Sequence, residues 1–143
     1  MTGARTFVLA LALLAFGAGA AAAARLEVTV TNVRAAKGTV RVSLCTEAEF
    51  LGDTCSFDAT APATMPETTV VFPDVPPGAY AAQGYLDEND NHEVDRTLLG
   101  IPEEGVLFSR DPSYTFSAPG FADTAFTVGP TGTRLTTRLR YWD

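Results

Sequence analysis

The segment 87–95 carries the residues whose types and spacing are best suited to chemistry. It reads Asp-Glu-Asn-Asp-Asn-His-Glu-Val-Asp, with oxygen-bearing side chains at alternate positions. Calcium takes six to eight oxygen ligands, and the calcium loops of helix–loop–helix (EF-hand) motifs begin D-x-[DN]-x-[DN]-G. Counted from its first residue, the segment supplies the following ligands: the side chains of Asp87, Asn89, Asn91 and Asp95, and the backbone carbonyl of Glu93. The spacing therefore predicts a calcium site.

The second half of this calcium motif is missing. His92 stands where glycine normally permits the sharp turn, and Leu98 stands where a bidentate glutamate normally completes the ligand shell. A bulky residue tolerates the left-handed backbone conformation poorly. The alternative is a solvated loop in which Asp and Asn oxygens accept hydrogen bonds from nearby backbone N–H groups. Glu103 and Glu104 have the same two interpretations: they are either exposed surface acids or further ligands of the cation.

Other catalytic chemistries find little support in the chain. His92 is the only histidine, so a Ser109–His92 pair is the one nucleophile and base to consider, and no nucleophile-elbow motif surrounds Ser109. A crowded acidic loop is not two carboxylates facing each other across a cleft, as glycoside cleavage requires. A single imidazole also disfavours zinc. We therefore expect a protein that is not an enzyme, with calcium as its one candidate cofactor.

Residues 1–24 have the pattern of a secretory signal peptide. Arg5 precedes an apolar run, and the segment ends in alanines, with cleavage expected after Ala24. An uncleaved membrane anchor is the alternative, although the run is short and its end is rich in Ala and Gly. Cleavage leaves a single domain, residues 25–143. We expect an exported protein, periplasmic or extracellular, with no stable membrane anchor.

The charge balance restricts the partners. The segment 25–143 keeps all 17 acidic residues and 9 of the 10 basic ones, since Arg5 is the only charged residue removed. An acidic surface repels nucleic acids and anionic membranes, so neither is an expected partner. The partner itself stays unknown.

Cys45 and Cys55, the only cysteines, follow the export signal and are expected to form a disulfide. The redox alternative is disfavoured, because the spacing is not C-x-x-C and no basic residue flanks either thiol.

Alternating apolar and polar residues predict a β protein. The expected strands are 26–33, 39–45, 68–72, 79–86, 113–118, 124–128 and 133–141. The first two are expected to form a hairpin through Lys37-Gly38, and 47–66 is expected to be a long connection. About seven strands without an amphipathic helix predict a single antiparallel β-sandwich. Arginines along 133–141 are expected to point outward and discourage edge pairing.

A second function is also open, namely an adhesion or carbohydrate/peptide-binding module. Its binding face would be formed by the loops 87–105 and 46–66, with exposed aromatic side chains. The aromatic candidates are Tyr80, Tyr85, Phe108 and Phe121. The alternative for all four is burial in the core, where aromatic residues on strands usually lie.

Four motifs in order resemble a bacterial family labelled domain of unknown function 2141 (DUF2141). They are Pro76-Pro77-Gly78-Ala79-Tyr80-Ala81, the skeleton Asp87-Glu88-Asn89-x-Asn91-x-x-x-Asp95, Leu99-Gly100-Ile101-Pro102-x-Glu104-Gly105, and Phe108-Ser109. The resemblance covers essentially the whole chain after residue 24. It implies an exported immunoglobulin-like or transthyretin-like β-sandwich, and it implies no activity.

The chain departs from the family pattern at the acidic loop. The family's histidine before the first aspartate is Leu86 here, and its two loop glycines are replaced by Asp90 and His92. Glu103 replaces the usual lysine, and Arg110 replaces the usual asparagine. An added acid raises cation affinity, whereas the loss of two glycines makes the turn harder to form.

Overall fold

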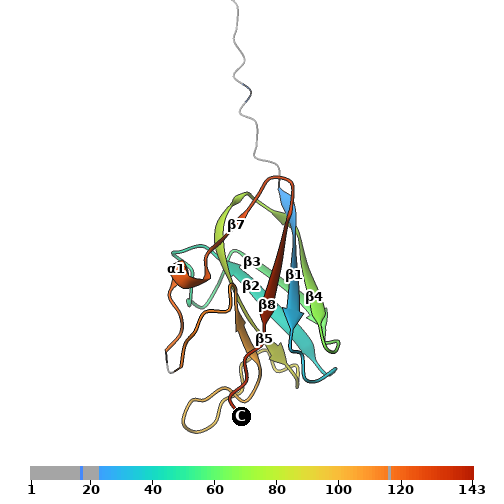
Figure 1. The fold of residues 1–143 in the computed structure, drawn as a ribbon, viewed down its shortest axis with the longest axis vertical. Coiled ribbons are helices and arrows are strands. Elements are labelled where there is room, and N and C mark those ends of the chain that lie inside the picture. Colours follow the sequence, from blue (N-terminus) through green and yellow to red (C-terminus); the bar gives the residue numbers. More distant parts are fainter. Residues whose placement is uncertain (1–16, 18–22, 116) are drawn as a thin grey trace, which may run out of the picture.

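A computed structural model describes residues 17, 23–115 and 117–143. The expected signal peptide therefore lies almost wholly outside the described residues. Within them, eight strands form two packed sheets, and one short helix lies between the sixth and seventh strands in the sequence (Figure 1). The elements are β1 (Ala24–Thr31), β2 (Thr39–Cys45), β3 (Phe57–Pro62), β4 (Thr68–Val75), β5 (Gly78–Asp87), β6 (Val106–Phe108), α1 (Phe121–Thr124), β7 (Phe126–Val128) and β8 (Thr133–Arg138). This confirms the expected β-sandwich.

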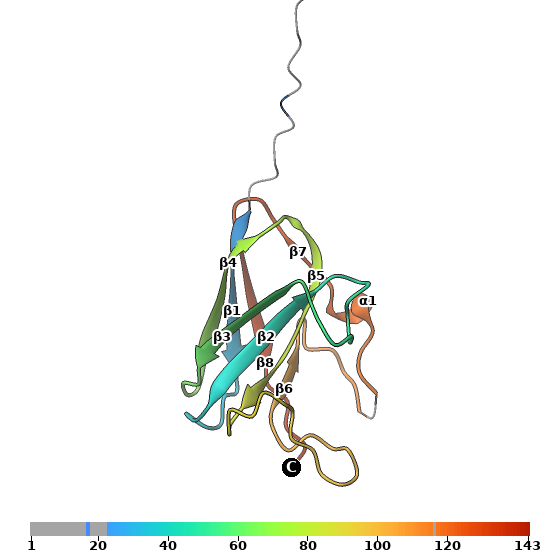
Figure 2. The same ribbon diagram turned by 180° about the vertical axis from the view of Figure 1, so that it is seen from behind.

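The smaller sheet has the strand order β4-β1-β8, and the larger has the order β3-β2-β5-β6, with β7 also pairing with β5. Figure 2 shows the larger sheet from behind, with β2 and β3 crossing in front of β1 and β8. Neighbouring strands are antiparallel except β1 and β8, which run parallel. The sandwich is therefore mixed in one of its two sheets.

The expected hairpin between 26–33 and 39–45 is wrong, because β1 and β2 belong to different sheets. Both strands alternate buried and more exposed residues. Packing the two apolar faces against each other buries Leu26, Val28 and Val30 together with Val40, Val42 and Leu44. Had the two strands paired within one sheet, these side chains would lie on the same face of that sheet. In two facing sheets, they instead pack against one another across the core.

Five further features of the strands differ from expectation. The connection 47–66 contains β3, whose Phe57, Ala59 and Ala61 are half-buried. Alanines and a terminal proline form strands weakly, which hides β3 in the sequence. β6 was likewise not anticipated, and β7 begins at Phe126 after the helical turn α1. The described part of 113–118 is not a strand, and β8 ends at Arg138.

No helix in the described residues is both long enough and apolar enough to cross a membrane.

Candidate functional site

The acidic loop leaves the sandwich at the end of its longest strand. Asp87 is the last residue of β5, and the antiparallel register places it beside Thr39, the first residue of β2. Gly38 lies so close that a Cβ there would stand 1.9 Å from the Asp87 carbonyl oxygen. Its φ of 74° also requires the left-handed conformation. We call residues 87–105 the rim loop; it projects from the lower end of the molecule in Figure 1.

Asp87 is fully buried and is held by three donors. Arg41 Nε donates to its Oδ2 at 2.6 Å, and the backbone N–H of His92 donates to the same oxygen at 3.0 Å. The backbone N–H of Asn91 donates to Oδ1 at 3.1 Å. Burial by itself raises the pKa of Asp87, but the hydrogen bonds from Arg41 and the loop outweigh it, so this pKa lies below its ordinary value. Asp87 therefore fastens the loop to the sheet.

Glu104 closes the other end of the acidic segment. Only 5% of it is exposed, and its carboxylate accepts the backbone N–H groups of Glu88 (2.9 Å) and Asp95 (3.2 Å). Burial raises its pKa, and the negative charges of Asp95 and Asp87 add to the effect. Glu104 is thus a backbone acceptor, while Glu103 is exposed.

Three of the five predicted calcium ligands come together. Asn89 Nδ2 lies 2.6 Å from Asp95 Oδ2, and Asn91 Nδ2 lies 2.8 Å from Asp95 Oδ1. The amide oxygens of Asn89 and Asn91 accept backbone N–H groups two residues ahead, at 3.2 and 3.0 Å. The Asp87 carboxylate is engaged by Arg41 and the loop backbone instead, and Glu93 is exposed. The loop is hydrogen-bonded as an Asx turn, and calcium binding stays a prediction.

Among the described residues, no group of three or more His, Cys, Asp or Glu side chains is arranged to hold a metal ion. A cation at this loop would therefore depend on amide and backbone oxygens as well as on Asp95.

The two positions where the family pattern has glycine adopt the conformation that glycine favours. Asp90 has φ of 55° and His92 has φ of 67°. Left-handed backbone at a non-glycine residue costs about 1–2 kcal/mol. The steric objection to His92 is thus real, and the Asp87 hydrogen bonds maintain the turn despite it.

Beyond Asp95 the rim loop forms a small tip with an apolar surface. Arg96 and Pro102 form an isolated bridge, and Thr97 N–H donates to the Ile101 carbonyl at 2.9 Å. The tip exposes Leu98 (107%), Leu99 (87%) and Ile101 (40%). We call these three residues the aliphatic tip. Of the large hydrophobic residues that are exposed in the described chain, the others are Leu51 and Met65.

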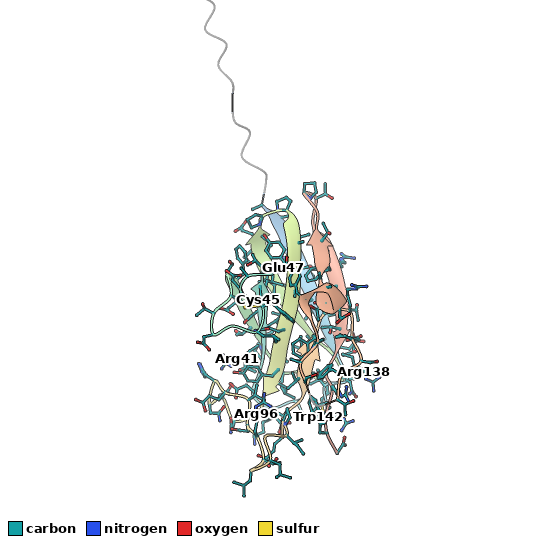
Figure 3. The ribbon with its side chains drawn as sticks, turned by 90° about the vertical axis from the view of Figure 1, so that its left-hand side faces the viewer. Arg41, Cys45, Glu47, Arg96, Arg138 and Trp142 are labelled. Carbon is teal, nitrogen blue, oxygen red and sulfur yellow. A yellow bond between two sulfur atoms is a disulfide. The ribbon has the colours of Figure 1, made fainter. Side chains whose placement is uncertain are left out.

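A cavity of about 270 Å³ adjoins the aliphatic tip. Its apolar lining includes Leu99, Ile101, Phe108, Tyr114 and Trp142. Figure 3 shows Trp142 beside Arg96 at the rim-loop end. We call this space the apolar cavity.

Aromatic rings make up one side of the apolar cavity. The Tyr114 ring meets Phe108 edge-on, with centroids 5.3 Å apart, and lies 6.0 Å from Trp142. Sequence reasoning missed Tyr114 and Trp142, because their segments carry no motif and meet only in the folded chain.

Three other candidate residues make contacts within the fold. Cys45 and Cys55 form the expected disulfide, with Cα atoms 4.6 Å apart. The buried Ser109 hydroxyl donates to the Thr124 carbonyl at 2.6 Å and accepts the Ala82 N–H at 2.9 Å. Ser109 therefore ties α1 to β5.

Only part of the binding face expected from loops 87–105 and 46–66 lies at the rim-loop end: Pro62 at the end of β3 pairs with Thr39 beside Asp87, and Ala63 N–H donates to the Gly38 carbonyl at 3.0 Å. The β2–β5 register places Cys45 beside Ala81 and Thr39 beside Asp87, so residues 46–56 leave the sheet at the opposite end from the rim loop. Of the four aromatic candidates, Tyr80 is buried and donates to the Pro76 carbonyl at 2.8 Å. Tyr85, Phe108 and Phe121 are half-buried.

The fold and the loop define a two-sheet β-sandwich that carries a braced rim loop with an apolar tip. The model of a family of uncharacterized proteins conserved in bacteria, DUF2141, matches residues 28–136, from β1 into β8. The chain belongs to this family, which confirms the resemblance seen in its sequence. No curated protein and no solved structure matches the chain.

Proposed function

We propose that the protein is an exported, non-enzymatic β-sandwich module that binds an apolar group of its ligand at the rim-loop end. The observation that carries this proposal is the aliphatic tip beside the apolar cavity. Scattered exposed aliphatic residues are common on protein surfaces, but a cluster next to a cavity is typical of a binding site. This binding face shares the rim loop with the second function considered from the sequence, and it uses the C-terminal segment around Trp142 in place of residues 46–56.

Bracing of the rim loop supports this role. Asp87 and Glu104 bind the loop backbone from its two ends, so the tip extends from an anchored base. A loop that is ordered before binding loses less conformational entropy when a ligand arrives. The two buried carboxylates therefore serve the tip indirectly, by holding its base.

A non-enzymatic role is supported by the position of the two candidate catalytic groups. His92 lies exposed on the rim loop, whereas the Ser109 hydroxyl is buried beneath α1 and bonded to backbone on both sides. Export is supported by the Cys45–Cys55 disulfide, because disulfides persist mainly outside the reducing cytosol.

Octanol is a suitable probe, since it is apolar and uncharged, and Trp142 is the only tryptophan of the chain. Titration of residues 25–143 with octanol should give a saturable change in Trp142 fluorescence. Leu99→Ser/Ile101→Ser should abolish saturation. Leu51→Ser/Met65→Ser, which removes exposed apolar side chains elsewhere, should retain it. A wild-type protein without saturation, or equal responses from both variants, would overturn the proposal.

Calcium binding by the rim loop is the second candidate function. It is favoured by the convergence of Asn89 and Asn91 on the Asp95 carboxylate. Rotation of both amides would turn their oxygens towards a cation beside Asp95, at the cost of the hydrogen bonds they now make. Glu93 carbonyl and water would have to supply further oxygens, because Asp87 is committed to Arg41.

A further inference from the structure

A second cavity adjoins the apolar one and has a different chemical character. Its volume is about 290 Å³, and its lining includes three arginines, Arg34, Arg138 and Arg140. We call it the arginine cavity. Phe108 and Tyr114 line both cavities, so the two spaces share an aromatic wall.

The arginine cavity is a cationic place on an acidic protein. The whole chain has a formal charge of −7, yet three of its ten basic residues line this one cavity. Asp111 lines the same cavity and Asp143 pairs with Arg34, so both nearby acids have partners. Asp143 Oδ2 accepts Arg34 Nη1 at 2.5 Å, and Asp111 Oδ1 accepts the Thr137 hydroxyl and the Arg138 backbone N–H at 3.0 and 2.8 Å. Within the described chain, no carboxylate forms a salt bridge with the Arg138 guanidinium.

Arg140 connects the two cavities. Its guanidinium carbon lies 4.7 Å from the Tyr114 ring centroid and 5.3 Å from that of Trp142, and one of its N–H groups donates to the Tyr114 carbonyl. Stacking on two rings fixes the position of this cation while leaving other guanidinium N–H groups as donors. Arg140 is therefore held where positive charge meets the aromatic wall.

The aromatic wall also contains an unused polar group. In the described residues, the Tyr114 hydroxyl is the one buried side-chain polar atom without a hydrogen-bond partner. A buried hydroxyl without a partner destabilises the folded protein. A ligand acceptor that meets this hydroxyl after a small movement of the Tyr114 ring would satisfy it.

We propose that the ligand of the rim-loop end is a small amphipathic anion, with its apolar part in the apolar cavity and its anionic head in the arginine cavity. This rests on the proposed function, which it extends by naming the ligand class. Two adjoining spaces of about 290 and 270 Å³ suit a small molecule. Guanidinium groups pair well with carboxylate and phosphate oxygens, and the aliphatic tip and Trp142 supply the apolar contacts.

Three probes separate the two halves of such a ligand. Octanoate has both parts, octanol has only the apolar part, and acetate has only the head. With Trp142 fluorescence as the readout, octanoate should bind about fivefold more tightly than octanol, the upper range for a partly exposed ion pair. Acetate should not saturate. If octanol binds and octanoate binds no more tightly, the ligand is not an anion, although the apolar binding site is retained. If neither probe binds, the proposed function itself is wrong.

Two arginine variants on the same segment provide a matched pair. Arg138→Gln removes a cation from the arginine cavity and should reduce the advantage of octanoate over octanol about fivefold. Arg134→Gln removes an exposed cation of β8 that lies outside both cavities, and should leave that ratio unchanged. Equal octanoate affinities for wild-type protein and Arg138→Gln would overturn the assignment of the head. An equal loss in the two variants would do the same, because it would indicate only a general effect of net charge.

Tyr114→Phe tests the shared wall. It should weaken octanoate binding and leave octanol binding unchanged, because only the anion offers the hydroxyl a strong acceptor. A loss of binding for both probes would instead indicate a damaged wall and overturn this role for the hydroxyl.

Discussion

Arg41 on β2 forms a 2.6 Å ion pair with Asp87, the first residue of the rim loop, which is completely buried. Two strands far apart in sequence are thereby joined at the point where the loop begins. The pair supports the loop as well as the sheet, because Asp87 also accepts two loop N–H groups. Loss of the arginine would leave a buried charge with backbone donors alone.

Arg41→Gln should therefore destabilise the protein by about 3 kcal/mol, the lower end of the range measured when one partner of a buried ion pair is removed. Urea unfolding at neutral pH measures the loss. The side chain of Arg134 is 89% exposed, so Arg134→Gln should change the stability by less than about 0.5 kcal/mol. Equal effects of the two substitutions would show that the Asp87 pair contributes no special stability.

The same pair predicts opposite pH dependences. In the wild-type protein the pKa of Asp87 lies below its ordinary 3.8, so its contribution is present above that pH and is lost as the pH falls through the lowered value. In Arg41→Gln, burial raises the pKa of Asp87, so ionisation costs stability as the pH rises through the new value. The stability difference between the two proteins should narrow between neutral pH and about pH 4. A constant difference over that range would contradict this account.

His92→Gly should stabilise the protein by about 0.5–1 kcal/mol, because a glycine adopts φ of 67° without strain. Asn91→Gly at the neighbouring position should destabilise it, since it loses the side-chain bonds to Glu93 N–H and Asp95. Thermal or urea unfolding of both variants measures the contrast. Destabilisation by His92→Gly would show that the imidazole itself supports the turn.

Calcium should bind the rim loop with a dissociation constant of about 0.1–1 mM, the range of weak extracellular sites. At about 1 mM free ion and a dissociation constant of about 0.1 mM, the gain in stability is about 1.4 kcal/mol. Calorimetric titration and melting in calcium or chelator measure both quantities. Asp95→Asn should weaken the response, and Asp74→Asn on β4 should not. If titration with calcium gives no heat and the melting midpoint is unchanged, the rim loop does not bind calcium.

Replacement of both cysteines by serine should lower the stability by about 2–3 kcal/mol, as expected when a short loop is no longer closed in the unfolded chain. Hydrogen bonds from Thr46 and Ser56 to Glu49, which lower the pKa of Glu49 to about 2, should keep residues 46–56 folded. Phe50 of this loop packs edge-on against Phe108, but no residue of 46–56 lines the apolar cavity, so octanol binding should be unchanged. An altered octanol response would show that the two ends are coupled.

The strand pattern and the acidic loop were predictable from local sequence. Alternation in Leu26, Val28 and Val30 or in Val40, Val42 and Leu44 reflects the period of a pleated strand, which depends on neighbouring residues only. The Asx turn at Asn89 and Asn91 is equally local, since each side chain bonds a backbone N–H two residues ahead. The need for a left-handed residue at His92 followed from turn sterics in the same way.

Tertiary structure decided how these pieces meet. Whether β1 and β2 pair or face each other, and whether Arg41 reaches Asp87, depend on sheet assignment and register, which short-range periodicity leaves open. Arg41 and Tyr85 each alternate with buried residues on their own strands. This alternation places the two residues beside each other only when β2 and β5 are known to be neighbours. Tyr114 and Trp142 line a cavity with Leu99 and Ile101 only because the C-terminal segment folds against the rim-loop end. The acidic loop was thus visible in the sequence, while its buried anchor and the cavities beside it required long-range packing.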